Sequence, residues 1–202
     1  MIEMPLGNNI DSAWIGPERV VLATSVDRLG KSNIITIGWV MRTNMDPPVL
    51  AIGLSKGSYS CANISRTGEF MLAIPGLDLA AAVMYCGSHS GADVDKFKEA
   101  GLTPAPAKIV HPPLIKECLC NLECKVIATQ EVHAHRVFFG EVVAHWSNGS
   151  NGSNGSNGSN ESNESNESNE SNERSLLIVG EESGYETVHE QAGFRLGAVG
   201  DG

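Results

Sequence analysis

The stretch SNIITIGWVMRTNMDPPVLAIGLSKGSYSCANI, residues 32–64, places two apolar runs on either side of a Pro-Pro pair. Val, Ile and Thr dominate the run at 33–41, and the run at 48–54 is almost wholly apolar, so both predict short β-strands. The prolines favour a turn between the two runs. This stretch therefore predicts two successive strands, and the polar residues along it become candidates for a binding site.

A polar, glycine-containing segment follows directly where the second of these strands ends. Lys56, Ser58, Tyr59 and Ser60 supply one ammonium and three hydroxyl groups. The backbone N–H groups of a glycine turn, and the positive end of any helix that starts there, favour an anion. The segment predicts a phosphate site, although Lys56 taken alone is more typical of a solvated turn.

The first strand adds an amide, a hydroxyl and an aromatic ring at Asn33, Thr36 and Trp39. A ligand with a phosphate at one end and a flat ring at the other would fit this strand and the polar segment together. Trp39 in isolation is more typical of ordinary core packing. A ring-and-phosphate ligand is therefore a hypothesis that depends on the whole stretch rather than on any one residue.

The rest of the chain before residue 147 consists mainly of predicted strands. The run at 19–27 is separated from the strand at 33–41 by the turn-like RLGKS, which predicts a hairpin. Further strands are expected at 69–75, 120–132 and 136–146, and helices at 76–86 and 91–102. Several short strands with helical excursions favour a β-barrel or a sandwich.

Length, charge and cysteine usage limit the class of protein. With 202 residues, 41% of them hydrophobic, the chain can bury one sizeable core. The formal net charge of -10 gives no general attraction to nucleic acid or to an anionic membrane. No secretory signal and no run of about 18 apolar residues occurs, so a cytoplasmic protein is expected. The five cysteines, an odd number, are expected to be reduced thiols.

A strict three-residue repeat occupies residues 147–173, where SNG triplets are followed by SNE triplets. The repeat has no apolar residue, so it cannot offset the entropy of ordering and is expected to be a flexible insert. Its Asn-x-Ser triplets match the glycosylation pattern, but without a secretory signal that match has no mechanism. We expect a single domain formed by residues 1–146 and 174–202 around the insert.

Other motifs are incomplete. GKS at 30–32 lacks the glycine five positions earlier that a phosphate-binding loop requires, and no G-x-G-x-x-G occurs. Cys118, Cys120 and Cys124 would share one face of a strand, which would suit a soft metal ion. Burial of these small side chains in the core is the favoured interpretation.

Four stretches, in order along the chain, carry a family resemblance. Besides residues 32–64 they are CGSHSGADVDKFKEAGLTP (86–104), LIKECLCNLECKV (114–126) and HRVFFGEVVAH (135–145). Over roughly residues 15–146 the chain resembles the flavin reductase-like family of FMN-binding split barrels, and within that family it is most similar to the flavoredoxins. The pattern S-G-x-x-x-D-K-F followed by G-L-T-P is the most specific part of the resemblance.

The resemblance implies a mainly β fold with α excursions, a split β-barrel of Greek-key type. It also implies a homodimer that holds FMN without a covalent bond near the subunit interface. The cofactor-binding residues that it implies are Asn33, Thr36, Gly38, Trp39, Val40, Met41, Lys56, Ser58, Tyr59, Ser60 and His135. A satisfied structural histidine is nearly as good an interpretation of His135. Asp95 and Lys96 are further candidates, which either contact the ligand or lock a helix by ion pairing.

Two classes of function follow from this resemblance. The favoured class is an FMN oxidoreductase, either an electron carrier with a redox protein partner or a flavin reductase that uses NAD(P)H. The alternative is a non-enzymatic split-barrel module that binds a phosphate-bearing ligand. Because the chemistry of a flavoprotein belongs largely to the cofactor, no side-chain acid or base is required and no catalytic residue is named.

Overall fold

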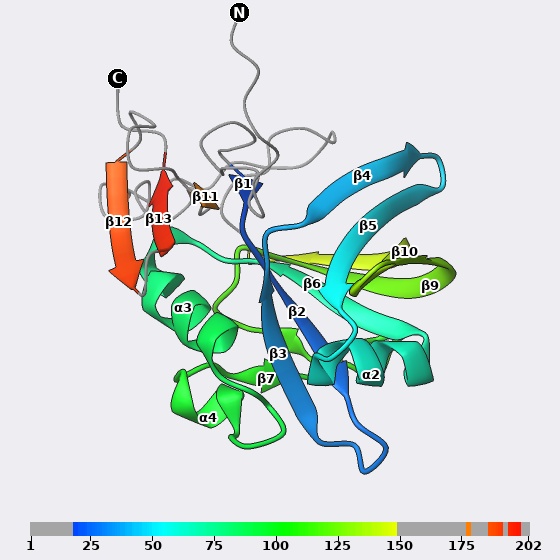
Figure 1. The fold of residues 1–202 in the computed structure, drawn as a ribbon, viewed down its shortest axis with the longest axis horizontal. Coiled ribbons are helices and arrows are strands. Elements are labelled where there is room, and N and C mark those ends of the chain that lie inside the picture. The colour runs from blue at the N-terminus through cyan, green and yellow to red at the C-terminus, as the bar shows by residue number, and fades with distance from the viewer. Residues whose placement is uncertain (1–17, 149–176, 179–185, 192–193, 199–202) are drawn as a thin grey trace, which may run out of the picture.

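A curved antiparallel sheet of seven strands forms the body of the protein (Figure 1). The computed structural model describes residues 18–148, 177–178, 186–191 and 194–198. In sheet order the strands are β3 (Ser32–Ile37), β2 (Val21–Val26), β6 (Glu69–Ile74), β9 (Cys120–Val132), β10 (His135–Ser147), β5 (Pro48–Ser55) and β4 (Val40–Met45). The edge strands β3 and β4 do not pair with each other, so the sheet does not close, and the predicted mainly β split barrel is confirmed.

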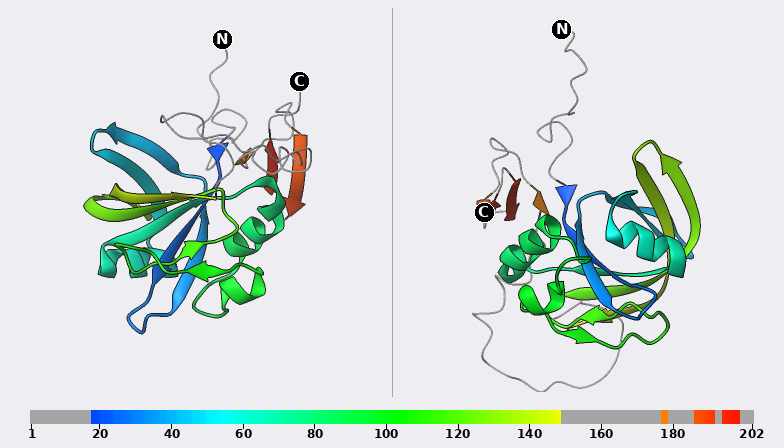
Figure 2. Two further views of the ribbon diagram at one scale, coloured as in Figure 1. Left: turned by 180° about the vertical axis from the view of Figure 1, so that it is seen from behind. Right: turned by 60° about the horizontal axis from the view of Figure 1, so that its bottom comes forward.

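Two smaller sheets accompany the main one. The first has the order β1 (Glu18–Arg19), β11 (Leu177–Ile178), β13 (Phe194–Ala198) and β12 (Glu186–Gln191), and the second pairs β7 (Pro104–Ala105) with β8 (Leu114–Ile115). Helix α3 (Ala80–Ser88), which follows the 3-10 turn η1 (Leu77–Leu79), contacts β12. Figure 2 shows the first small sheet beside α3, away from the long β9–β10 hairpin.

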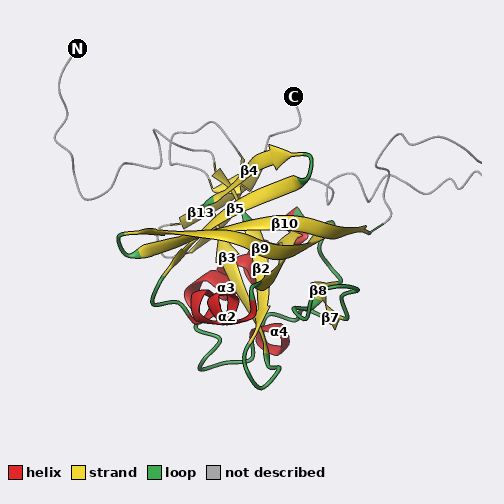
Figure 3. Cartoon of the chain, turned by 90° about the vertical axis from the view of Figure 1, so that its right-hand side faces the viewer, coloured by secondary structure: helices red, strands yellow, loops and turns green. Residues whose placement is uncertain are grey.

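The helices lie on opposite sides of β2 and β3. In Figure 1, α2 (Tyr59–Thr67) is on one side, and α3 with the short α4 (Lys96–Glu99) is on the other. Every residue of β2 is buried, because its alternating side chains reach two hydrophobic clusters. Leu22 packs in the cluster that contains Val83 of α3, and Val21 packs in the cluster that contains Ile64 of α2. Figure 3 shows the strands as one layer with these helices gathered beside β2 and β3.

Most of the strands expected from the sequence are confirmed. The bounds of β2, β5, β6 and the β9–β10 pair lie within a residue or two of the expected ranges, and β2 pairs with β3 as the predicted hairpin. Each contains β-branched or aromatic residues, and the burial of one or both of its faces makes that composition easy to interpret.

The strand expected at 33–41 is instead two strands. β3 ends at Ile37, and the Val40 N–H donates to the Gly38 carbonyl oxygen (3.0 Å) in a tight turn before β4 pairs with β5. Trp39 therefore does not lie on one strand with Asn33 and Thr36, as expected, but in the break between two strands.

Helix α2 was not expected from the sequence. Its residues YSCANISRT are mostly weak helix formers, so composition gives little signal. The helix depends on its ends: the Ser58 side chain accepts a hydrogen bond from the Cys61 N–H (3.1 Å), and Gly68 ends it in the left-handed conformation (φ 68°). The helix expected at 91–102 is reduced to the four residues of α4.

The three cysteines expected on one strand face lie in three different surroundings. Cys118 packs in the cluster beside α3, Cys124 packs in the cluster beside α2, and Cys120 is half-buried at the start of β9. Burial raises the pKa of the Cys124 thiol to about 12. The favoured interpretation, burial in the core, holds for Cys118 and Cys124. The described part of the chain brings no three metal-binding side chains together.

Two expectations concern segments rather than single elements. From residue 149 onward, the repeat at 147–173 lies outside the described residues, whereas Ser147 ends β10. Among the described helices, none is long and apolar enough to cross a membrane.

Candidate functional site

A groove of about 420 Å³ lies where the chain turns from β3 into β4. Its lining consists of Glu18, Arg19, Gly38, Trp39, Val40, Met41, Ala51, Ile52, Gly53 and Val137. The Trp39 side chain is 55% exposed, and its ring centroid lies 4.6 Å from that of His135. A Cβ atom at Gly53 would approach Trp39 Cε3 to 3.3 Å, so the absence of a side chain at Gly53 lets the indole pack on β5. An indole supported in this way, yet more than half exposed, can stack on a flat ring.

Three buried polar atoms lie near helix α2 without a hydrogen-bond partner among the described residues: Ser25 Oγ, Asn33 Oδ1 and Asn63 Nδ2. Ser25 and Asn33 face each other in the β2–β3 register. Asn33 Nδ2 donates to Ser60 Oγ (2.7 Å), and Ser60 lies three residues before Asn63 in α2. Buried polar groups without partners are rare in folded proteins, and they occur where a ligand or an ordered water supplies the partner.

The loop after α3 closes over Asn33. A Cβ atom at Gly91 would lie 1.8 Å from Asn33 Oδ1, so only glycine fits there. Lys31 Nζ donates to the Gly91 carbonyl oxygen (3.0 Å) and fixes the loop against the β2–β3 hairpin. Gly91 is the glycine of the S-G-x-x-x-D-K-F pattern, and this close approach gives the pattern a physical reason.

The aspartate and lysine of the same pattern hold helix α4 in place. Asp95 accepts a hydrogen bond from the Lys98 N–H (3.3 Å) as the N-cap of α4. Lys96 is 4% exposed, and its Nζ donates to the carbonyl oxygens of Ile34 (2.8 Å) and Cys86 (2.6 Å). Burial lowers the pKa of Lys96. The two residues therefore fasten α4 by capping and carbonyl contacts, with the Lys96 ammonium directly behind the backbone of β3.

The turn that leads into α2 has its polar side chains engaged within the protein. Lys56 forms an ion pair with Glu131, which also accepts from Arg136 Nε (2.7 Å). The hydrogen bonds from Lys56 and Arg136 hold the pKa of Glu131 below its ordinary value. The Tyr59 hydroxyl donates to Asp27 Oδ2 (2.9 Å), and this bond raises the pKa of Tyr59. A phosphate bound at this turn would therefore have to replace Glu131 as the ion-pair partner of Lys56.

The structure divides the expected site residues into groups. Gly38, Trp39, Val40 and Met41 line the groove together, and His135 stands beside Trp39. Asn33 and Ser60 meet in the polar cluster near α2. Thr36 belongs to neither group, because its hydroxyl donates to the Val83 carbonyl oxygen of α3 (2.5 Å). Asn33 and Thr36 are three residues apart on β3, so they face opposite sides of the strand.

Sequence reasoning missed four positions that shape these two groups: Ser25, Gly53, Asn63 and Gly91. Gly91 could have been found, because it stands in the most specific pattern of the chain. The other three gain their role from strand register and helix position, which no local pattern reveals.

Comparison with known proteins shows the family of the chain. The model of the flavin reductase like domain matches residues 16–157. The chain belongs to this flavin reductase-like family. An uncharacterized protein of Archaeoglobus fulgidus is 34% identical over 136 residues, which cover 67% of this chain and 75% of that protein.

Solved structures of flavin reductase-like proteins agree with the fold. Flavoredoxin from Methanosarcina acetivorans superposes with a TM-score of 0.75 at 27% identity, over 100% of this chain and 93% of its own. Flavoredoxin of Desulfovibrio vulgaris (Miyazaki F) superposes with a TM-score of 0.65 at 29% identity, over 73% of this chain and 78% of its own. The expected similarity to flavoredoxins within the flavin reductase-like family is thus confirmed.

Proposed function

We propose that the protein binds FMN non-covalently and works as a flavin-dependent oxidoreductase of the flavoredoxin or flavin reductase type. Family membership and the similarity to two flavoredoxin structures support this proposal. The observation that carries it is the partly exposed Trp39 indole, which lines a groove of about 420 Å³. This volume falls within the range of small-molecule binding sites.

The residues of the two groups fit the chemistry of FMN, which combines a flat ring, a hydroxylated chain and a phosphate. In this proposal the backbone from Gly38 to Met41 and the Trp39 ring meet the flavin ring, with His135 at the edge of the groove. Asn33 Oδ1 is a buried acceptor without a partner among the described residues, and in this proposal a hydroxyl of the ribityl chain reaches it once the covering loop at Gly91 moves aside. Ser60 lies within hydrogen-bond distance of Asn33 and extends the same polar surface.

The phosphate remains assigned to the turn before α2, through Lys56, Ser58, Tyr59 and Ser60. The Lys56 ammonium would leave its ion pair with Glu131 and place its positive charge against the phosphate. Ser58 caps α2 by accepting from the Cys61 N–H, and the positive N-terminal end of the helix favours an anion at the same place. Thr36, Asp95 and Lys96 act in this proposal as supports that hold β3, α3 and α4 together around the ligand.

Bound FMN supplies the redox chemistry, since its ring accepts a hydride or single electrons. The chain would contribute position: the Trp39 ring would pack against the flavin, and the apolar groove residues would exclude water from it. We also propose a homodimer, and either NAD(P)H or a redox protein as the electron donor or acceptor.

The first test is the visible absorption spectrum of the purified protein, followed by acid release and identification of the chromophore. A yellow protein that releases one FMN per chain would support the proposal, and FAD instead of FMN would correct the cofactor. Anaerobic addition of NADH or NADPH then distinguishes a flavin reductase, which is bleached, from a carrier that needs a protein donor. A protein that stays colourless after incubation with FMN would contradict the proposal and favour a non-enzymatic module for another phosphate-bearing ligand.

A further inference from the structure

A second cavity, of about 400 Å³, lies between the β2–β3 turn and helix α2. Its lining consists of Asp27, Arg28, Leu29, Tyr59, Ala62, Asn63 and Arg66. Of these residues Tyr59 also belongs to the proposed phosphate turn, and Asn63 to the polar cluster near α2. The cavity therefore adjoins the proposed flavin site, but its two arginines and Leu29 lie outside that site.

Two arginines give this cavity a positive wall in a chain whose formal net charge is -10. Arg66 Nη2 donates to the Val26 carbonyl oxygen (2.9 Å), which engages one of the five N–H donors of its guanidinium group. The Arg28 side chain forms no hydrogen bond or ion pair with any residue in the described part of the chain. The two guanidinium groups thus retain most of their donors for a ligand.

The acidic residue of the cavity is already engaged in building the turn. Asp27 Oδ1 accepts from the Leu29 N–H (2.8 Å) and the Lys31 N–H (2.9 Å), and Oδ2 accepts from the Tyr59 hydroxyl. The hydrogen bond from the Lys31 backbone is the main reason that the pKa of Asp27 lies below its ordinary value. These bonds fix the backbone on both sides of Arg28, so the position of Arg28 is set before any ligand arrives.

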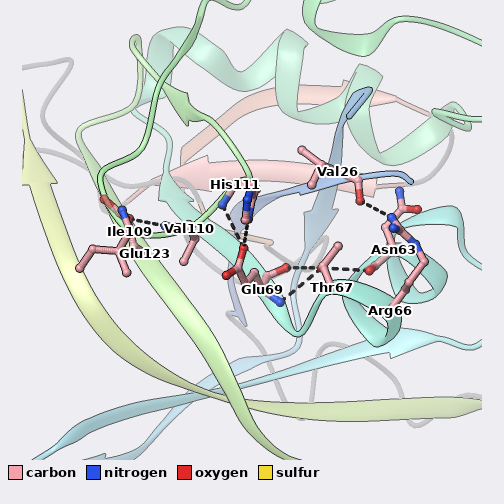
Figure 4. A network of polar contacts seen from close by, with 9 residues as sticks. All are labelled: Val26, Asn63, Arg66, Thr67, Glu69, Ile109, Val110, His111 and Glu123. Carbon is pink, nitrogen blue, oxygen red and sulfur yellow. Dashed lines mark hydrogen bonds and ion pairs between the residues drawn. The ribbon is translucent and has the colours of Figure 1, made fainter. Parts of the chain in front are cut away.

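A buried amide belongs to the same wall. Asn63 is 4% exposed, and its Nδ2 has no hydrogen-bond partner among the described residues. Figure 4 shows Asn63 beside Arg66 on α2, with the Arg66 guanidinium directed toward the Val26 carbonyl. The cavity therefore combines positive charge with a buried donor that no described residue satisfies, next to the apolar side chains of Leu29 and Ala62.

We propose that this cavity binds a small organic anion, a carboxylate or phosphate group attached to an apolar body. The anionic oxygens would accept from Arg28 and Arg66, because guanidinium groups bind such oxygens in a bidentate way. The apolar body would lie against Leu29, Ala62 and the Tyr59 ring. The cavity shares Tyr59 with the proposed phosphate turn but takes its anion at Arg28 and Arg66, so in this proposal the anion and the flavin bind at the same time.

Isothermal titration of the purified protein, with its flavin bound, tests the proposal with three probes: phenyl phosphate, benzoate and inorganic phosphate. We expect one saturable site, tighter for the probe with a ring than for inorganic phosphate. The comparison of phenyl phosphate with benzoate identifies the preferred anionic group. Arg28→Gln and Arg66→Gln should each weaken binding by roughly tenfold or more, the effect of losing a hydrogen bond to a charged group.

Lys98→Gln, in the exposed part of α4, is the control that removes the same charge from another surface. Arg28→Gln is the decisive variant, because Arg28 makes no described contact whose loss would unfold the protein. Its flavin absorbance should stay unchanged. Equal affinity in Arg28→Gln and the wild type, or no saturation with any of the three probes, would overturn the proposal. Displacement of bound probe by FMN added to flavin-free protein would also overturn it, because the cavity would then belong to the flavin site.

Discussion

Replacement of Glu123 by glutamine should destabilise the protein strongly. Glu123 lies on β9 with no exposed surface, and its carboxylate accepts four hydrogen bonds. The donors are the backbone N–H groups of Lys108 (3.0 Å), Ile109 (2.6 Å) and Val110 (3.0 Å) and the Trp146 indole Nε1 (2.7 Å). Figure 4 shows Glu123 with Ile109 and Val110, next to the similar contact between Glu69 and His111. One carboxylate thus anchors a loop segment, β9 and the end of β10 together.

The magnitude follows from the geometry. Two donors point at Oε1 and two at Oε2, so an amide in either orientation sets its NH2 group against two N–H donors. Each buried donor left unsatisfied costs about 1–3 kcal/mol, so Glu123→Gln should lower the free energy of unfolding by roughly 2–6 kcal/mol. For a chain of this length the melting temperature should fall by roughly 5–20 °C.

Thermal unfolding followed by far-UV circular dichroism measures the effect. Glu117→Gln is the matched control, because Glu117 is a half-buried carboxylate whose only donor from another described residue is the Thr103 N–H (3.0 Å). We expect the control to change the melting temperature by a few degrees at most. A Glu123→Gln variant as stable as Glu117→Gln would refute the reasoning that the four bonds stabilise the fold.

Low pH should reduce the difference in stability between the wild type and Glu123→Gln. Burial by itself would raise the pKa of Glu123, but the backbone N–H groups and the Trp146 indole outweigh burial and hold the pKa below the ordinary value. A carboxyl group with a depressed pKa in the folded state stabilises the fold above its unfolded pKa, near 4.3, and loses this contribution as the pH falls through the folded value. The gap between wild type and Glu123→Gln should therefore be full at pH 7 and shrink below about pH 4.

Three further predictions concern the candidate flavin site. Gly91→Ala should weaken FMN binding and lower the melting temperature, because the new Cβ would lie 1.8 Å from Asn33 Oδ1. If an FMN titration finds the affinity unchanged, the polar cluster of Ser25, Asn33 and Asn63 does not bind the cofactor. Lys56→Ala should weaken FMN binding by about 1.5–3 kcal/mol. Glu131→Gln releases Lys56 from its ion pair and should not weaken FMN binding. Equal losses of FMN affinity in both variants would point to a structural role for the ion pair. Trp39→Ala should raise the fluorescence of bound flavin, since a stacked indole quenches it, and fluorescence as low as in the wild type would place the ring elsewhere.

The sequence was sufficient for the sheet but not for the connections that shape the site. Strands such as β5 and β9 are continuous runs whose composition has one interpretation. The break at Gly38 was missed because Val40 and Met41 continue the β-like composition, and only the pairing of β4 with β5 separates them from β3. Helix α2 was missed because capping, rather than propensity, defines it.

The candidate site was predicted as a set of residues rather than as a geometry. The family resemblance named Gly38 to Met41, and these neighbours in sequence line one groove. The contact between Asn33 and Ser60 spans 27 positions and depends on where α2 packs against β3. The same limit hid Lys56 and Glu131, whose meeting requires the tip of a distant hairpin to reach the start of α2.

Glu131 carries two cationic partners, and this sharing matters for the mechanics of the β9–β10 hairpin. Lys56 connects Glu131 to the turn before α2, while Arg136 connects it to Ser65 near the other end of that helix. Two separate contacts therefore connect the tip of the hairpin to the two ends of α2. If an anion takes Lys56 away, Arg136 still holds the carboxylate, so the hairpin and α2 move as one piece whether or not the neighbouring turn is occupied.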